Sequence, residues 1–173
     1  MKAVSARFTV AAAIIIAVAG CSSAPQKTVR KAPAVVKAPP RGPERIVLLD
    51  EPLLFQDEHE PVRTSAVFEF DLPSRPRRAR LVLRYRGVPG ALSEDYKMGR
   101  FRHRVELNAR YLMDLNTFSK SENETVSHTK WISVGMLRAH NELAFHAGDD
   151  GARDKTPNHD EFELLQVVME FDW

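Results

Sequence analysis

The closing stretch of the chain, Phe162-Glu-Leu-Leu-Gln-Val-Val-Met-Glu-Phe-Asp-Trp173, decides the fold. Every second residue from Leu165 to Trp173 is apolar, whereas Phe162 and Leu164 have the opposite parity. Alternation with a period of two predicts a β-strand that buries one face. The change of parity predicts a β-bulge near Leu164 and Leu165, where one extra residue restores the alternation.

The same pattern recurs upstream and predicts an all-β chain. Apolar residues alternate with polar ones over 68–72, 79–86, 101–108 and 143–146, and shorter runs cover 111–115 and 131–134. The wholly apolar run 46–49 predicts a buried strand. Turn-forming residues separate these runs, at 72–74, 87–90, 147–151 and 156–158. About eight short strands with turns between them predict an antiparallel β-sandwich.

The start of the chain has the pattern of a secretory leader. Lys2 and Arg7 precede an apolar run at 10–19, which is too short to span a bilayer as a helix. The four residues 18–21, Val-Ala-Gly-Cys, resemble the lipobox of bacterial lipoproteins. The resemblance implies that residues 1–20 are removed as a signal peptide and that Cys21 becomes the lipid-attachment residue. An ordinary secretory signal with a chance cysteine is the alternative.

The lipobox resemblance also implies a location. A protein that carries two or more acyl chains stays anchored in a membrane. Ser22 follows the cysteine, and in enterobacterial lipoproteins the absence of aspartate there favours the outer membrane. We therefore expect an outer-membrane lipoprotein that faces the periplasm and has the membrane as one partner.

Residues 21–43 form a predicted tether between this anchor and the domain. The segment holds five prolines and five basic residues but no acidic residue. Proline fixes φ and removes a backbone donor, so the segment is expected to be extended and solvated. Its positive charges serve either only to keep it solvated or to contact anionic lipid or polymer. The predicted β-sandwich domain is residues 44–173.

Charge and cysteine content exclude some classes of protein. Residues 44–173 carry 18 basic and 23 acidic residues, so the domain is mildly acidic. Nucleic acid is not an expected partner, because it normally requires a basic surface. Cys21 is the only cysteine, so no disulfide is available and the apolar core must stabilise the domain.

No motif in the sequence indicates catalysis. HExxH, G-x-S-x-G and phosphate-binding loop patterns are all absent, and we expect a protein that is not an enzyme. Acidic and amide side chains in one loop could hold a structural calcium ion. These are Asp149, Asp150, Asp154, Asn158 and Asp160, which turn formation and solvation also explain. No other cofactor is expected.

Arginines and aromatic residues are the candidate ligand-binding groups. Two rows, Arg78, Arg80, Arg84 and Arg86 on one strand and Arg102 and Arg104 on another, would form a basic surface if their strands were neighbours. The alternative is pairing with Glu69, Asp71 and Glu106. Tyr96, Tyr111 and Trp131 could stack on a sugar ring, although burial is the commoner role of an aromatic. The predicted site comprises Arg84, Arg86, Arg102, Arg104, Tyr111 and Trp131.

Three segments resemble the galactose-binding-like jelly roll found in many carbohydrate-binding modules. They are Arg104–Asn108 with Tyr111 and Leu112, the stretch 134–145, and 160–164 at the start of the closing strand. The resemblance implies a jelly-roll sandwich. Ala109 and His140 stand where glycine is usual, so we expect Asn108 and Asn141 to take any position of positive φ.

Together these features predict a lipid-anchored binding or scaffolding module without catalytic activity. Its expected partner is an envelope polysaccharide or an envelope protein. The alternative is a structural or assembly subunit of an envelope protein complex, for which an exposed apolar patch would be the sign.

Overall fold

The computed structural model describes residues 41–56, 62–148 and 161–173, which belong to one compact unit, Ala38–Trp173. Within these residues no helix is long and apolar enough to cross a membrane. The described elements are nine strands, one α-helix and two 3-10 helices. They are β1 (Arg45–Leu49), β2 (Leu53–Phe55), β3 (Ser65–Asp71), β4 (Arg78–Arg86), α1 (Glu94–Lys97), β5 (Arg104–Leu107), β6 (Arg110–Asp114), η1 (Leu115–Thr117), β7 (Val126–Ile132), η2 (Val134–Met136), β8 (His140–His146) and β9 (Phe162–Asp172).

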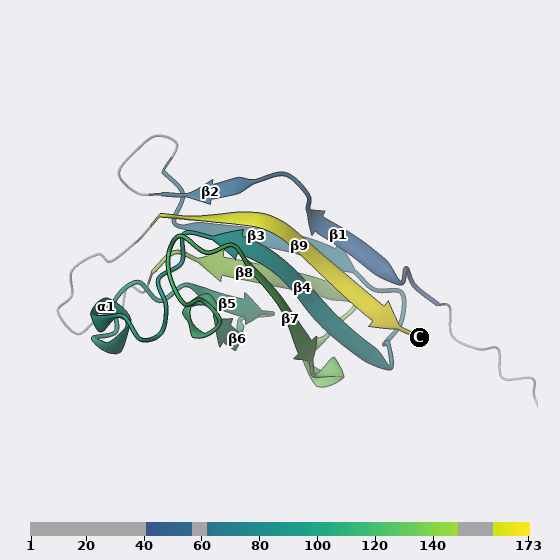
Figure 1. The fold of residues 1–173 in the computed structure, drawn as a ribbon. Coiled ribbons are helices and arrows are strands. Elements are labelled where there is room, and N and C mark those ends of the chain that lie inside the picture. The colour runs from purple at the N-terminus through teal and green to yellow at the C-terminus, as the bar shows by residue number, and fades with distance from the viewer. Residues whose placement is uncertain (1–40, 57–61, 149–160) are drawn as a thin grey trace, which may run out of the picture. The chain divides into compact units, whose positions relative to one another are not determined.

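The strands form two antiparallel sheets. The larger sheet has the order β1-β9-β4-β7, with β2 also paired to β9, and the smaller sheet has the order β3-β8-β5-β6. Figure 1 shows the yellow strand β9 lying between β4 on one side and β1 and β2 on the other. Buried residues from both sheets form one apolar core, so the predicted all-β antiparallel sandwich is confirmed.

The order of the strands is that of a jelly roll. β1 and β2 both pair with β9 and act as one interrupted strand. The other pairs are β3 with β8, β4 with β7, and β5 with β6, as in one long hairpin that is rolled up. Rolling it brings β4 beside β9 and β5 beside β8, which closes the two sheets.

β4 shows why these residues form a two-layered core. Leu81, Leu83 and Tyr85 are fully buried, whereas the four arginines of the strand, Arg78, Arg80, Arg84 and Arg86, point outward. Leu143 and Phe145 of β8 are buried from the smaller sheet. Full burial of such a side chain is worth about 1.5–3 kcal/mol relative to exposure.

The predicted bulge in β9 is confirmed. Arg84 of β4 pairs with Gln166, but the next residue, Tyr85, pairs with Leu164, so Leu165 is the extra residue. Leu164 and Val167 are both buried on either side of it, whereas Leu165 is only half-buried. The bulge therefore lets two segments of opposite parity face the same core.

The strand predicted at 46–49 is present as β1, but the prediction that it is buried is wrong. β1 is at the edge of the larger sheet, and 48% of Val47 is exposed. β2, α1 and the first half of β7 were also not predicted. β7 is the opposite edge strand, and polar residues on it, such as Ser127 and Thr129, hide the alternation between buried Val126 and Ile132.

The turn between β5 and β6 consists of Asn108 and Ala109, which have φ values of 54° and 60°. Two consecutive positive φ values are typical of a type I′ hairpin turn. The predicted positive φ of Asn108 is thus confirmed. The prediction for Asn141 is wrong, because this residue lies within β8 in regular pairing with Phe70.

Candidate functional site

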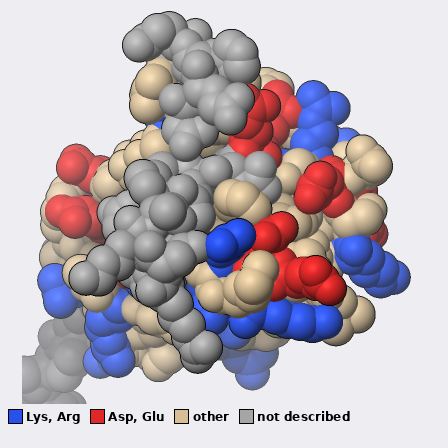
Figure 2. Space-filling view, turned by 90° about the vertical axis from the view of Figure 1, so that its left-hand side faces the viewer, with Lys and Arg blue, Asp and Glu red and all other residues tan. Residues whose placement is uncertain are grey.

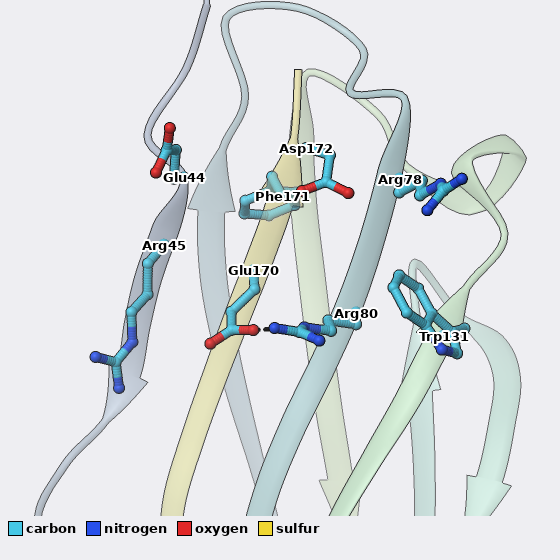
Figure 3. Close-up of a pocket in the computed structure, with 8 residues that line it drawn as sticks. All are labelled: Glu44, Arg45, Arg78, Arg80, Trp131, Glu170, Phe171 and Asp172. Atoms are coloured by element: carbon cyan, nitrogen blue, oxygen red, sulfur yellow. Dashed lines mark hydrogen bonds and ion pairs between the residues drawn. The ribbon is translucent and has the colours of Figure 1, made fainter.

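A depression lies on the outer face of the larger sheet. Figure 3 shows its lining side chains, which come from β1, β9, β4 and β7 and from the residue before β1. Its volume is about 320 Å³, at the lower end of the range for small-ligand sites. The lining residues are Glu44, Arg45, Arg78, Arg80, Trp131, Glu170, Phe171 and Asp172.

Strand register aligns four of these residues in one row across the sheet. Arg45 of β1 is opposite Glu170 of β9, and Glu170 is also opposite Arg80 of β4. Arg80 in turn is opposite Trp131 of β7. Residues that are directly opposite one another point to the same face of a sheet, so all four side chains share the outer face. We call Arg45, Glu170, Arg80 and Trp131 the cross-strand row.

Arg80 occupies the centre of the cross-strand row and makes contacts on both sides. Its Nε donates a hydrogen bond of 2.5 Å to Oε2 of Glu170. Its Cζ lies 5.7 Å from the centroid of the Trp131 ring, within the range of a cation–π interaction. Both charged side chains are partly exposed, so the ion pair contributes little stability. Its main effect is to hold the guanidinium group in a defined orientation beside the indole.

Trp131 is the exposed aromatic residue of the depression. The residue is 58% exposed, although an indole of this size is usually largely buried. It lies on an edge strand, and its ring is accessible beside the fixed guanidinium group of Arg80. The depression therefore offers a flat apolar surface next to hydrogen-bonding groups.

The charges that line the depression are balanced. Three arginines, Arg45, Arg78 and Arg80, face three carboxylates, Glu44, Glu170 and Asp172. A balanced set of donors and acceptors suits a ligand with many hydroxyl groups and no net charge. An anionic ligand would gain little from the local field, because the carboxylates offset the guanidinium groups.

The two predicted arginine rows do not form one surface. Arg84 and Arg86 lie on β4 in the larger sheet, whereas Arg104 lies on β5 in the smaller sheet and Arg102 just precedes β5. Their strands belong to different layers of the sandwich, so the expected basic surface is corrected to two separate groups. Trp131 lies with the first group and Tyr111 with the second.

The ion-pair partners of the arginines also differ from the predicted alternative. Arg80 pairs with Glu170 and Arg86 with Glu163, both on β9. Glu69 and Asp71 lie on β3 in the other sheet. One predicted pair is present among the described residues: Nη1 of Arg104 lies 3.9 Å from Oε1 of Glu106, on the same strand. Glu163 and Glu170 could have been noticed as acidic residues that interrupt an apolar strand.

The second group of predicted residues lies at the β6 edge of the smaller sheet. The Cζ atom of Arg102 is 5.7 Å from the ring centroid of Tyr96, whose hydroxyl donates a 3.1 Å hydrogen bond to Oδ2 of Asp114. Burial, followed by the nearby charge of Asp114, raises the pKa of both Tyr96 and Tyr111. This cluster is mixed in charge. Figure 2, which views the end of the molecule where α1 lies, likewise shows acidic and basic side chains interspersed.

Two predicted sites lie outside the described residues. Cys21 and the calcium candidates Asp149, Asp150 and Asp160, with Asp154 and Asn158, belong to segments that the structure leaves undescribed. Lipid attachment at Cys21 and calcium in this loop stay predictions.

Comparison with known proteins finds similarity to solved structures. No family model matches the sequence, and no curated protein matches it. The fold is similar to that of a family 35 carbohydrate-binding module from Clostridium thermocellum, with 8% sequence identity and a TM-score of 0.35. The match covers 72% of this chain and 96% of that chain.

Proposed function

We propose that the chain is a non-catalytic glycan-binding module whose ligand sits in the depression against Trp131. The observation that carries this proposal is the pairing of an exposed indole with the fixed guanidinium group of Arg80. A pyranose ring has an apolar face of C–H groups and a rim of hydroxyls. Its face can stack on the indole while its hydroxyls bond to the guanidinium and carboxylate groups.

The balance of charge in the depression supports a neutral glycan rather than an acidic one. A single basic surface formed by both arginine rows would suit an acidic glycan, but the rows lie in different sheets. The depression itself is lined by as many carboxylates as arginines, so it has no net positive charge. Binding of a neutral glycan should change little as salt concentration rises, because charge screening leaves hydrogen bonds and stacking largely intact.

The cellular setting is part of the proposal. The lipobox resemblance supports an outer-membrane lipoprotein that faces the periplasm, where the glycan ligand would be an envelope polysaccharide. The alternative is a structural or assembly subunit of an envelope protein complex. An exposed apolar patch would favour this alternative. The large apolar residues that are exposed in the described part include Val67 of β3 and, on either side of α1, Leu92 and Met98, so they come from separate segments.

The test is a glycan array followed by calorimetry on the full chain. We expect wild-type protein to bind at least one neutral glycan and Trp131→Ala to lose at least tenfold in affinity. Tyr111→Ala is the matched control, because Tyr111 is similarly exposed, at 59%, but lies in the other sheet. Equal binding by Trp131→Ala would refute the site. Binding restricted to acidic glycans and weakened by salt would refute the neutral ligand, and a folded protein that binds no glycan would favour the assembly subunit.

A further inference from the structure

We propose that Glu69, His140 and Glu142, on the outer face of the smaller sheet, bind a divalent transition-metal ion. One ring nitrogen of His140 and one carboxylate oxygen from each glutamate lie within 4.8 Å of one another. A cation placed among three atoms at this spacing can contact all of them after small rotations of exposed side chains. The site is independent of the depression, which lies on the other sheet.

Strand pairing assembles the site. Glu69 of β3 is directly opposite Glu142 of β8, and Asp71 is opposite His140. The intervening residues Phe70 and Asn141 are buried, so the four polar side chains all point outward. Fixed positions on two hydrogen-bonded strands place the ligands more precisely than positions on a loop would.

The start of β8 is held rigidly beneath the site. The backbone N–H of Glu142 donates to Oδ1 of Asn108 at 3.0 Å. The side chain of Asn141 accepts from the backbone of Arg138 and donates back to its carbonyl oxygen, both at 2.8 Å. The first contact fixes the backbone of Glu142, and the other two close the turn 138–141, which includes His140.

Glu69 and Glu142 place two negative charges directly opposite each other, while Asp71 is paired with His140. Carboxylates that are directly opposite each other across an antiparallel pair repel one another. Among the described residues, no lysine or arginine forms an ion pair with Glu69 or Glu142. A divalent cation bound between the two carboxylates would remove this repulsion.

Asp71 acts as a positioning residue for the imidazole. Its Oδ1 lies 2.9 Å from Nδ1 of His140. When a carboxylate accepts the proton of one ring nitrogen, the lone pair on the other nitrogen is free for a metal. Histidine ligands to metals almost always have such a partner, which fixes the ring and increases its basicity.

The donor set indicates the class of ion. One imidazole nitrogen and two carboxylate oxygens suit zinc and its neighbours in the transition series, whereas calcium prefers a set made entirely of oxygen. Three protein ligands leave at least one position for water, as expected where all three residues are exposed.

The test uses the full chain after treatment with a chelator. Zinc chloride is titrated by calorimetry, and cobalt chloride by visible absorption, in wild type and in His140→Gln and Glu142→Gln. We expect saturable binding near one ion per chain in wild type and at least a tenfold loss of affinity in each variant. Asp71→Asn should weaken binding less than either. His146→Gln is the matched control, because His146 lies on the same strand but outside the cluster.

Three outcomes would overturn the proposal. They are the absence of zinc binding by folded wild-type protein at millimolar concentration, unchanged binding in His140→Gln, and an equal loss in His146→Gln. A parallel titration with calcium chloride separates this site from the predicted calcium loop, because His140→Gln should leave any calcium binding unchanged. Circular dichroism of each variant confirms that the fold is retained.

Discussion

Asn108 donates a buried hydrogen bond of 3.1 Å from Nδ2 to Oδ1 of Asn141, which joins the β5–β6 turn to the start of β8 across 33 positions of sequence. Nδ2 of Asn108 also donates to the carbonyl oxygen of Met136, at 2.7 Å. The two amides also bond to the backbone of Arg138 and of Glu142.

Asn141→Ala should destabilise the protein strongly. The substitution leaves the backbone N–H and C=O of Arg138 and the amide of Asn108 without their buried partner. Since each unsatisfied buried group costs about 1–3 kcal/mol, we expect a loss of at least 2 kcal/mol in urea unfolding. Asn123→Ala removes an exposed amide and should change stability by less than about 0.5 kcal/mol. Similar losses in both variants would contradict the role of Asn141.

Ala109→Gly should stabilise the protein. Ala109 has a φ of 60°, where an L-residue with a Cβ is strained by about 1–2 kcal/mol and glycine is not. Glycine loses part of this gain through the greater entropy of the unfolded chain, which leaves a net of about 0.5–1 kcal/mol. Ala144→Gly, within β8, is the control and should destabilise by about 0.5–1 kcal/mol. A lower midpoint for Ala109→Gly would show that the turn is not strained.

Leu164 and Leu165 test the bulge in β9. Leu164 is fully buried and Leu165 is the unpaired, half-buried residue beside it. Leu164→Ala should therefore cost about 2–5 kcal/mol, because it leaves a cavity in the core. Leu165→Ala should cost about 1 kcal/mol, since less apolar surface is lost. The free energy of unfolding of both variants is measured by denaturant titration. A larger loss in Leu165→Ala than in Leu164→Ala would contradict the assignment of Leu165 as the bulged residue.

His128 should make the protein sensitive to mild acid. Its ring stacks on Phe118 with centroids 3.6 Å apart. Burial, and then the charge of Lys130, lowers the pKa of His128 below its usual 6.5. Just below pH 6.5 the unfolded chain therefore binds more protons at this residue than the folded chain does, so stability falls as pH falls through this range. His128→Phe keeps the stacked ring and removes the titration.

The free energy of unfolding, measured between pH 5 and 8, tests this prediction. The wild type should lose more stability than His128→Phe on acidification from pH 7. Identical pH profiles would mean that His128 titrates equally in the folded and unfolded states.

Cys21 should be required for membrane attachment. The lipobox resemblance of residues 18–21 is the basis for this prediction. Labelled palmitate should enter the wild type and Ser22→Ala but not Cys21→Ser, when each is expressed in a bacterium that processes lipoproteins. Label in Cys21→Ser at the wild-type level would exclude lipidation at this residue.

The sequence predicted local structure well where alternation was regular. In β4, the arginines outside and Leu81, Leu83 and Tyr85 inside follow directly from a period of two. The extra residue at Leu165 was also predictable, because a strand can change parity only through a bulge. Edge strands were harder, since β1 and β7 have less of a buried face to reveal their pattern.

The candidate site was only partly predictable, because it depends on which strands are neighbours. Trp131 was identified from its residue type, but its partner Arg80 was placed in a row with Arg84 rather than beside an indole. Glu170 and Arg45 were missed, since they are distant in sequence and meet only when β9 lies between β1 and β4. The alternation of apolar and polar residues shows on which face of a strand a side chain lies. The order of the strands in the sheet decides which side chains lie beside it.

The position of the depression at the beginning of β1 has a mechanical consequence. Glu44 and Arg45 are the first residues to enter the sheet, and both also line the depression. Tension on the chain before residue 44 would reach a ligand stacked on Trp131 by crossing a single row of four strands. A ligand that bridged the row would hold edge strand β1 against separation from β9.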